Sequence, residues 1–224
     1  RRVNDDGTTD LIHRGSDPWA TLGVRIDAEA RQAWVCAIKN TENYPGEVRV
    51  YNIDTGDRLQ TFDLTSKVQQ GNCNDIALFG DGRRAYATDR ENPHVYRLDL
   101  KKGSVDIWST DDLLESHVVG TNGIAITPNR KKIVVTNYLP ARLMVIDRAN
   151  PNEVRKVSMV RADGRPGLLS GDRFGLGGAD GIRFIGNTLY VMSSGKLGRI
   201  TPVDDSWRQA RFETFDLPDR GYSG

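Results

Sequence analysis

The stretch NCNDIALFGDGRRAYATD, residues 72–89, decides how the rest of the sequence is interpreted. Two short apolar runs flank a turn rich in Asp and Gly, which is typical of a β-hairpin. The first strand begins on the polar pair Asn74-Asp75, and the second ends on another polar pair, Thr88-Asp89. Oxygen-bearing side chains are costly to bury without partners, so their place at the start of a core strand calls for an explanation.

The same pattern recurs along the chain. Each copy has a short apolar strand, a polar turn and a second apolar strand, and two further strands with alternating apolar residues follow it. The copies begin at Leu22, Asn74, Asn122 and Asp180, so the later copies are spaced 48 to 58 residues apart. Four strands per unit at this spacing are the sequence signature of a β-propeller.

The further strands of each unit have recognisable sequences. The expected third strands are EVRVYNI, HVYRLDL, RLMVIDR and LGRITPV, and the expected fourth strands are RLQTFDL, SVDIWST, VRKVSMV and ARFETFDL.

We therefore predict an all-β fold, a six-bladed β-propeller of which about four and a half blades lie in this sequence. Residues 1–224 would form a single propeller domain that lacks parts of its first and last blades. Residues 1–15 have the pattern of an outer strand of a preceding blade, and the final DLPDRGYSG leads toward a further one. The rest of the ring would come from residues outside this sequence or from a partner chain, because an open ring exposes sheet edges.

Composition excludes several other classes. The chain has 224 residues, 38% of them apolar and 27% charged, as in ordinary soluble globular proteins. Its net charge of +1 would not gather nucleic acid, and no apolar run approaches the length of a membrane span. We expect neither nucleic acid nor membrane as a partner, whereas the oligomeric state and the cellular compartment stay open. Cys36 and Cys73 are too few for a disulfide framework, and the sequence favours two buried free thiols over a bridge between them.

One repeat position points to a metal ion. The first strand of each propeller blade lines the central channel, so Leu22, Asn74, Asn122 and Asp180 would converge near its axis. Ca²⁺ accepts amide and carboxylate oxygens, usually six to eight of them. A single such residue would be interpreted as a turn residue, but three at one repeat position favour a cation site. The cysteine and histidine residues have no zinc-binding spacing.

At the motifs NDI, NGI and DGI the chain resembles the calcium-dependent six-bladed propeller lactonases. This group includes the gluconolactonases, senescence marker protein (regucalcin) and, more distantly, the paraoxonases. The resemblance runs from about Gly15 to Gly224. It implies a catalytic Ca²⁺ at the floor of the channel, held by Asn74, Asn122 and Asp180, with Asp180 also acting as the general base.

The chain departs from the family pattern in two places. The family's first ligand is typically a Glu at the start of its first blade, and no matching motif is present. The paraoxonase pattern has His-Gly where this chain has Leu22-Gly23, which disfavours a mechanism based on His. The segment NDI…YATD is closer to the paraoxonase version, which carries a second, structural calcium, and this likeness implies Asp75 as a ligand of that ion.

The predicted function is a hydrolase of lactones or related esters that depends on Ca²⁺ or another divalent cation. The metal would polarise the carbonyl while a carboxylate activates water. No Gly-x-Ser-x-Gly elbow is present, which disfavours a serine hydrolase. Tyr138 and Arg173 are candidate substrate contacts, the latter in the Gly-rich segment 165–178, which we interpret as a lid or rim; solvated loop residues are the alternative.

Two other functions fit the same repeats. One is a non-catalytic propeller scaffold that binds a protein or a small ligand on its rim. The other is a propeller similar to strictosidine synthase, which would use an acidic residue rather than a metal.

Overall fold

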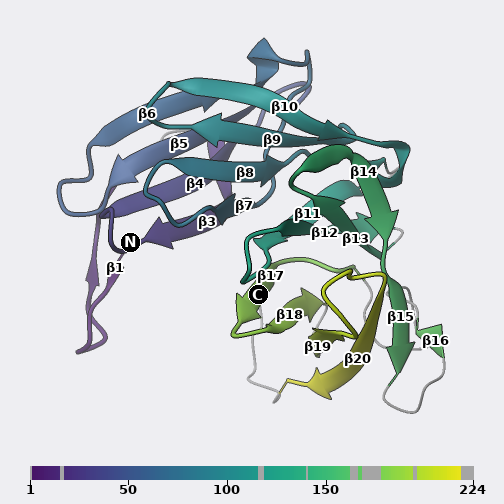
Figure 1. Cartoon of the computed structure of the whole chain (residues 1–224). Coiled ribbons are helices and arrows are strands. Elements are labelled where there is room, and N and C mark those ends of the chain that lie inside the picture. The colour runs from purple at the N-terminus through teal and green to yellow at the C-terminus, as the bar shows by residue number, and fades with distance from the viewer. Residues whose placement is uncertain are drawn as a thin grey trace. The chain divides into compact units, whose positions relative to one another are not determined.

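A computed structural model shows an all-β protein, as predicted (Figure 1). Within the part of the chain that it describes, the only helices are the three-residue 3₁₀ turns η1 (Leu64–Ser66) and η2 (Asp112–Leu114), and no helix could cross a membrane. The described residues are 2–15, 18–115, 119–139, 141–161, 166–167, 178–193 and 196–217.

The chain forms two compact units, Arg1–Trp108 and Ser109–Gly224, and each is described by itself. We predicted a six-bladed ring formed by a single propeller domain. Both statements depend on how the two units are arranged, so both stay predictions. The structure shows an all-β chain with three four-stranded antiparallel sheets and a six-stranded sheet that contains a fourth antiparallel set, β17 to β20.

The first unit contains a short hairpin and two four-stranded antiparallel sheets, in the orders β3–β4–β5–β6 and β10–β9–β8–β7 (Figure 1). The hairpin stands where the sequence predicts an outer strand of a preceding blade. The strands are β1 (Arg2–Val3), β2 (Thr9–Asp10), β3 (Trp19–Asp27), β4 (Gln32–Lys39), β5 (Gly46–Asn52), β6 (Arg58–Asp63), β7 (Ile76–Leu78), β8 (Arg84–Thr88), β9 (His94–Asp99) and β10 (Ser104–Thr110).

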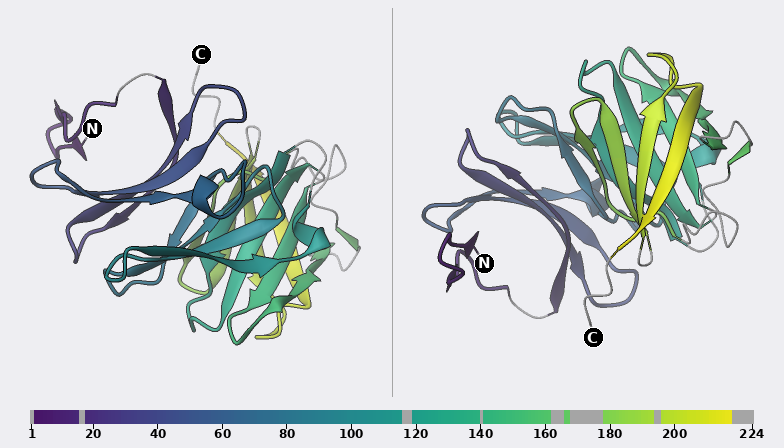
Figure 2. Two further views of the ribbon diagram at one scale, coloured as in Figure 1. Left: turned by 90° about the horizontal axis from the view of Figure 1, so that it is seen from above. Right: turned by 90° about the horizontal axis from the view of Figure 1, so that it is seen from below.

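The second unit contains a four-stranded sheet, β11–β12–β13–β14, and a six-stranded sheet, β16–β15–β20–β19–β18–β17. These two sheets lie face to face (Figure 2). Their strands are β11 (Val119–Ile126), β12 (Lys132–Leu139), β13 (Arg142–Asp147), β14 (Asn150–Lys156), β15 (Ser158–Arg161), β16 (Pro166–Gly167), β17 (Ile182–Ile185), β18 (Thr188–Ser193), β19 (Lys196–Pro202) and β20 (Gln209–Asp216).

The segment VRKVSMV, expected to form one strand, is divided between the two sheets of this unit. The amide nitrogen of Val157 donates to the Leu143 carbonyl oxygen at 2.8 Å, and that of Ser158 donates to the Arg208 carbonyl oxygen at 2.9 Å. The chain therefore leaves the first sheet at Val157, and β15 pairs in parallel with β20 of the next sheet. The prediction of a single outer strand is wrong here, because both halves alternate in burial while they pack on different sheets.

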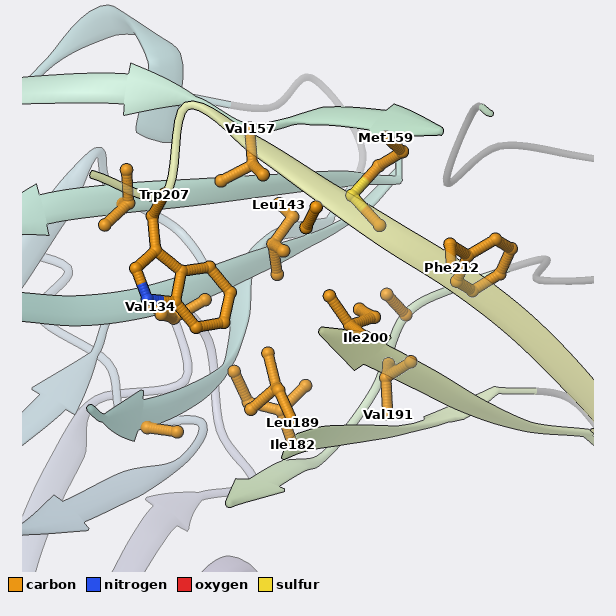
Figure 3. Close-up of a cluster of buried hydrophobic side chains, with 14 of the residues drawn as sticks. Val134, Leu143, Val157, Met159, Ile182, Leu189, Val191, Ile200, Trp207 and Phe212 are labelled. Atoms are coloured by element: carbon orange, nitrogen blue, oxygen red, sulfur yellow. The ribbon is translucent and has the colours of Figure 1, made fainter. Parts of the chain in front are cut away.

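Each unit has its own hydrophobic core between its sheets. In the second unit, Leu143 and Val134 from one sheet meet Ile200 and Val191 from the other, and the Trp207 ring lies at one side of the cluster (Figure 3). In the first unit, Trp34 stacks on Phe62 with ring centroids 6.0 Å apart. Residues at alternate positions of a strand, such as Leu143 and Val145, share one face of their sheet and pack into the same core.

Cys36 on β4 and Cys73, which precedes β7, form a disulfide with their Cα atoms 5.3 Å apart. The expectation of two free thiols is therefore wrong. Both residues are fully buried, as expected, in the core between the two sheets of the first unit. The packing of these sheets brings the thiols together, although they are separated by 37 residues in the chain.

Candidate functional site

The four aligned repeat positions lie at the same place in their sheets. The pairing of β3 with β4 shifts register between Thr21 and Val24, and the pairing of β11 with β12 shifts between Thr121 and Ile124. Each shift is a β-bulge at the start of an inner strand, where an extra residue re-aims the side chains. Leu22 and Asn122 lie within these bulges.

Asn74 and Asp180 have the same backbone geometry in the two remaining sheets. The Asn74 amide donates to the Thr88 carbonyl oxygen at 3.0 Å, and the Thr88 amide donates to the Asp75 carbonyl oxygen at 3.1 Å. Asp180 repeats this pattern with Met192, which donates in turn to the Gly181 carbonyl oxygen, both at 2.9 Å. Hydrogen bonding thus supports the alignment of these two repeats.

Glycines join the neighbouring inner strands at these bulges. In the first unit, the Gly23 amide donates to the Asn74 carbonyl oxygen at 2.8 Å, and a Cβ on Gly23 would lie 2.7 Å from the Cα of Asp75. In the second unit, a Cβ on Gly123 would come against the Asp180 carbonyl oxygen and within 2.9 Å of the Ile182 amide nitrogen. Both contacts leave no room for a side chain, so the inner strands meet where the candidate ligands lie.

The structure brings two of the candidate ligands together. Asn122 lies on β11, and Asp180 lies two residues before the neighbouring strand β17; Asn122 is 6% exposed and Asp180 is exposed to solvent. Asn74, half-buried, lies beside the position of Leu22 in the first unit. The convergence of Asn74 with the other two residues stays a prediction, because it depends on the arrangement of the two units.

The Thr136 hydroxyl lies at the junction between the two inner strands of the second unit. It accepts a hydrogen bond from the Gly123 amide at 2.9 Å and lies 3.3 Å from the Asp180 carbonyl oxygen, to which it donates. Thr136 is fully buried. In the first unit, Thr88 is its counterpart and accepts from the Asp75 amide at 3.1 Å. Sequence reasoning missed both roles, although the threonine recurs 14 residues after each Asn.

Asp75, the candidate ligand of a second calcium, has a partner within the protein. Nη2 of Arg25 on β3 lies 2.8 Å from Oδ2 of Asp75, and the Asp75 side chain is 7% exposed. The guanidinium supplies the positive charge that a buried carboxylate needs. Ligation of a second ion by Asp75 stays a prediction and would require Arg25 to move.

Asp89, the second polar residue at the end of β8, is a buried carboxylate that organises the following loop. It accepts hydrogen bonds from the amides of Glu91 and Asn92 at 2.9 and 3.1 Å, and from the Tyr96 hydroxyl at 2.6 Å. Burial raises the pKa of Asp89, while the Tyr96 hydroxyl and the loop amides oppose this change. The polar residue at the end of the opening stretch therefore has a structural role, since it holds the loop after β8.

The candidate substrate contacts differ in what the structure shows. Tyr138 is half-buried, and its ring lies against Gly178, where a Cβ would come within 2.5 Å of the ring carbons. Arg173 and most of the segment 165–178 lie outside the described residues. In the part of the chain that is described, no group of three His, Cys, Asp or Glu side chains could hold a metal ion. This finding does not test the predicted ligand set, because two of its three members are Asn.

Comparison with known proteins supports the fold and leaves the function open. No protein-family model and no curated protein matches the chain. The chain is similar to the major allergen Mala s 1 of Malassezia sympodialis, with a TM-score of 0.65 and 12% identity over 89% of this chain and 64% of that one. It thus spans less than two thirds of the allergen's length.

Two further solved structures give likenesses of the same kind. The nidogen/laminin complex matches with a TM-score of 0.51 and 14% identity, over 88% of this chain and 80% of that one. The computationally designed Ika4 protein matches with 0.52 and 11%, over 94% and 99%. At such identities the likeness shows the fold alone. The fold defines an all-β protein of successive antiparallel sheets, and it is compatible with a β-propeller.

Proposed function

We propose that this protein is a Ca²⁺-dependent hydrolase of lactones or related esters, built as a six-bladed β-propeller. The observation that carries the proposal is the similar place of three oxygen-bearing residues in their sheets. Asn74 and Asp180 make matching backbone hydrogen bonds, and Asn122 lies in the bulge of β11. The residues after Asn74 and Asn122 also make matching amide bonds to a threonine hydroxyl. Chance turn residues would not be expected to recur at the beginning of the inner strand in three sheets.

The donor set suits a hard cation. Two amide oxygens and one carboxylate are the ligand types that Ca²⁺ prefers, and waters would complete its coordination. When bound there, Ca²⁺ would act as a Lewis acid on the carbonyl of a lactone or ester. The carboxylate of Asp180, exposed at the start of β17, is placed to accept a proton from an attacking water. Tyr138 and Arg173 are proposed to contact the substrate.

Calcium titration of the intact protein by calorimetry tests the metal site. We expect binding that is lost in Asn122→Leu, which places in the third repeat the residue found at position 22. Asp106→Asn, which removes an exposed carboxylate of the first unit, is the matched control and should bind like the parent. Absence of calcium binding by the parent protein would contradict the proposal.

Hydrolysis of a lactone panel, followed by acid release, tests the activity. We expect EDTA to abolish hydrolysis, added Ca²⁺ to restore it, and Asp180→Asn to reduce it at least a hundredfold. Full activity in Asp180→Asn would exclude the proposed role of that carboxylate.

A non-catalytic scaffold that binds a ligand on its rim is the second candidate. Two features favour it. Leu22 supplies no oxygen ligand at the fourth equivalent position, and the Asp75 carboxylate is already paired with Arg25. On this alternative EDTA leaves the function intact, whereas changes in the rim loops abolish it.

A further inference from the structure

A groove lies at the opposite end of β11 and β17 from Asn122 and Asp180. Its cavity volume is about 420 Å³, which is within the range of small-molecule sites. Three turns of the second unit form it, namely 127–129 after β11, the turn at Asn187 after β17, and 201–207 at the end of β19. Polar groups on its walls are the features that could bind a ligand.

Two carboxylates, Asp204 and Asp205, stand on the groove wall without a salt bridge to any described residue. Hydrogen bonds from Ser206, one of them from its amide at 2.8 Å, lower the pKa of Asp204. None of the described residues that line the groove has a basic side chain. The oxygen atoms of the two side chains can accept hydrogen bonds from a ligand.

Donors lie on the same walls. Trp207 lines the groove although its side chain is only 4% exposed, and among the described residues no group accepts a hydrogen bond from its indole N–H. The indole nitrogen is not fully enclosed by the protein, so it reaches solvent. Asn129 uses its Oδ1 to accept from Thr127 Oγ1 at 2.8 Å and from the Lys131 amide at 3.0 Å, which leaves its NH₂ for a ligand.

This combination selects one kind of ligand. An organic cation could satisfy the carboxylates, but it offers no acceptor to the indole N–H. An anion would be repelled by Asp204 and Asp205. A hydroxyl group both donates and accepts, so one molecule with several hydroxyls can satisfy both kinds of group. Phe184, Pro128 and Pro202 add apolar surface for the C–H faces of such a molecule.

We propose that this groove binds a neutral sugar of about monosaccharide size through Asp205, Asn129 and the indole N–H of Trp207. The inference is independent of the proposed hydrolase activity, because none of these residues belongs to the candidate metal site. Sugar binding is therefore expected in the presence of EDTA as well as of Ca²⁺.

The indole N–H resonance of Trp207 provides a direct test by ¹H–¹⁵N NMR. The chain has four tryptophans, and the spectrum of Trp207→Phe serves only to assign the signal. The intact protein is titrated with glucose, galactose and mannose, and separately with tetramethylammonium. We expect at least one sugar to shift the Trp207 resonance, and Asp205→Ala to weaken that binding at least tenfold.

The controls separate this site from general effects. Asp106→Ala removes an exposed carboxylate in the first unit and should leave the sugar affinity unchanged within twofold. No shift with any of the three sugars, an equal response in Asp205→Ala, or a response to tetramethylammonium alone would each overturn the proposal.

Discussion

Gly123 on β11 lies directly against the backbone of Asp180, the residue two positions before β17. In the first unit, Gly23 has the same relation to Asn74, whose carbonyl oxygen would be 2.6 Å from a Cβ at position 23. The glycine in one inner strand therefore sets how closely the candidate ligand of the next strand approaches.

Gly123→Ala should separate the two inner strands of the second unit. The added methyl group would meet backbone atoms, which cannot move aside as a flexible side chain could. We expect a loss of about 1–3 kcal/mol in the free energy of unfolding, as for other overpacked sites. Urea denaturation measures it. Gly181→Ala is the matched control, because its Cβ would meet nothing within 4 Å; equal losses in both variants would contradict this account.

Thr136→Val should destabilise the same junction for a different reason. Valine keeps the shape but removes the oxygen that accepts from the Gly123 amide at 2.9 Å, which leaves a buried N–H without a partner. Such a loss costs about 1–3 kcal/mol. Thr136→Ser keeps the hydroxyl and should recover most of the loss in urea denaturation. A Ser variant as unstable as the Val variant would show that the methyl group, rather than the hydroxyl, matters.

The repeating strands could be predicted from the sequence because burial on one face of a sheet imposes alternation. That signal placed Asn122 and Asp180 at equivalent positions, and the bulge at Asn122 and the backbone hydrogen bonds of Asp180 agree with it. The same signal could not show that the chain changes sheets at Val157. Alternation records which side chains are buried, but it does not record which sheet buries them.

Contacts between sheets were the other limit of prediction. The Arg25–Asp75 ion pair joins residues 50 positions apart, and the Cys36–Cys73 disulfide joins residues 37 apart. Neither pairing leaves a local pattern, because both depend on how one sheet packs on the next. The glycine at 123 did leave a signal in the NGI motif, but its use as a contact surface became visible only in the structure.

Removal of the Cys36–Cys73 disulfide should destabilise the first unit. The bond closes a loop with a sequence separation of 37, for which the loss of chain entropy in the unfolded state corresponds to about 4 kcal/mol. We expect Cys36→Ala/Cys73→Ala to unfold at lower urea concentration than the oxidised parent. A reductant should lower the midpoint of the parent and leave that of the variant unchanged. Equal midpoints for the oxidised parent and the variant would argue against the bond.

Asp99 should make the stability of the first unit depend on acidity. Hydrogen bonds from the Arg83 guanidinium, at 2.8 and 2.7 Å, lower its pKa from 3.8 to about 2. A carboxyl group whose pKa is lowered by folding stabilises the fold at pH values above its ordinary pKa. This contribution disappears as the pH falls from about 4 to about 2. Asp99→Asn should therefore be less stable than the parent at pH 6 and nearly equal at pH 2 in urea denaturation. Asp106→Asn, whose partner Arg97 lies 3.5 Å away in an exposed pair, should differ little at either pH, and a constant deficit of Asp99→Asn across this range would contradict the assignment.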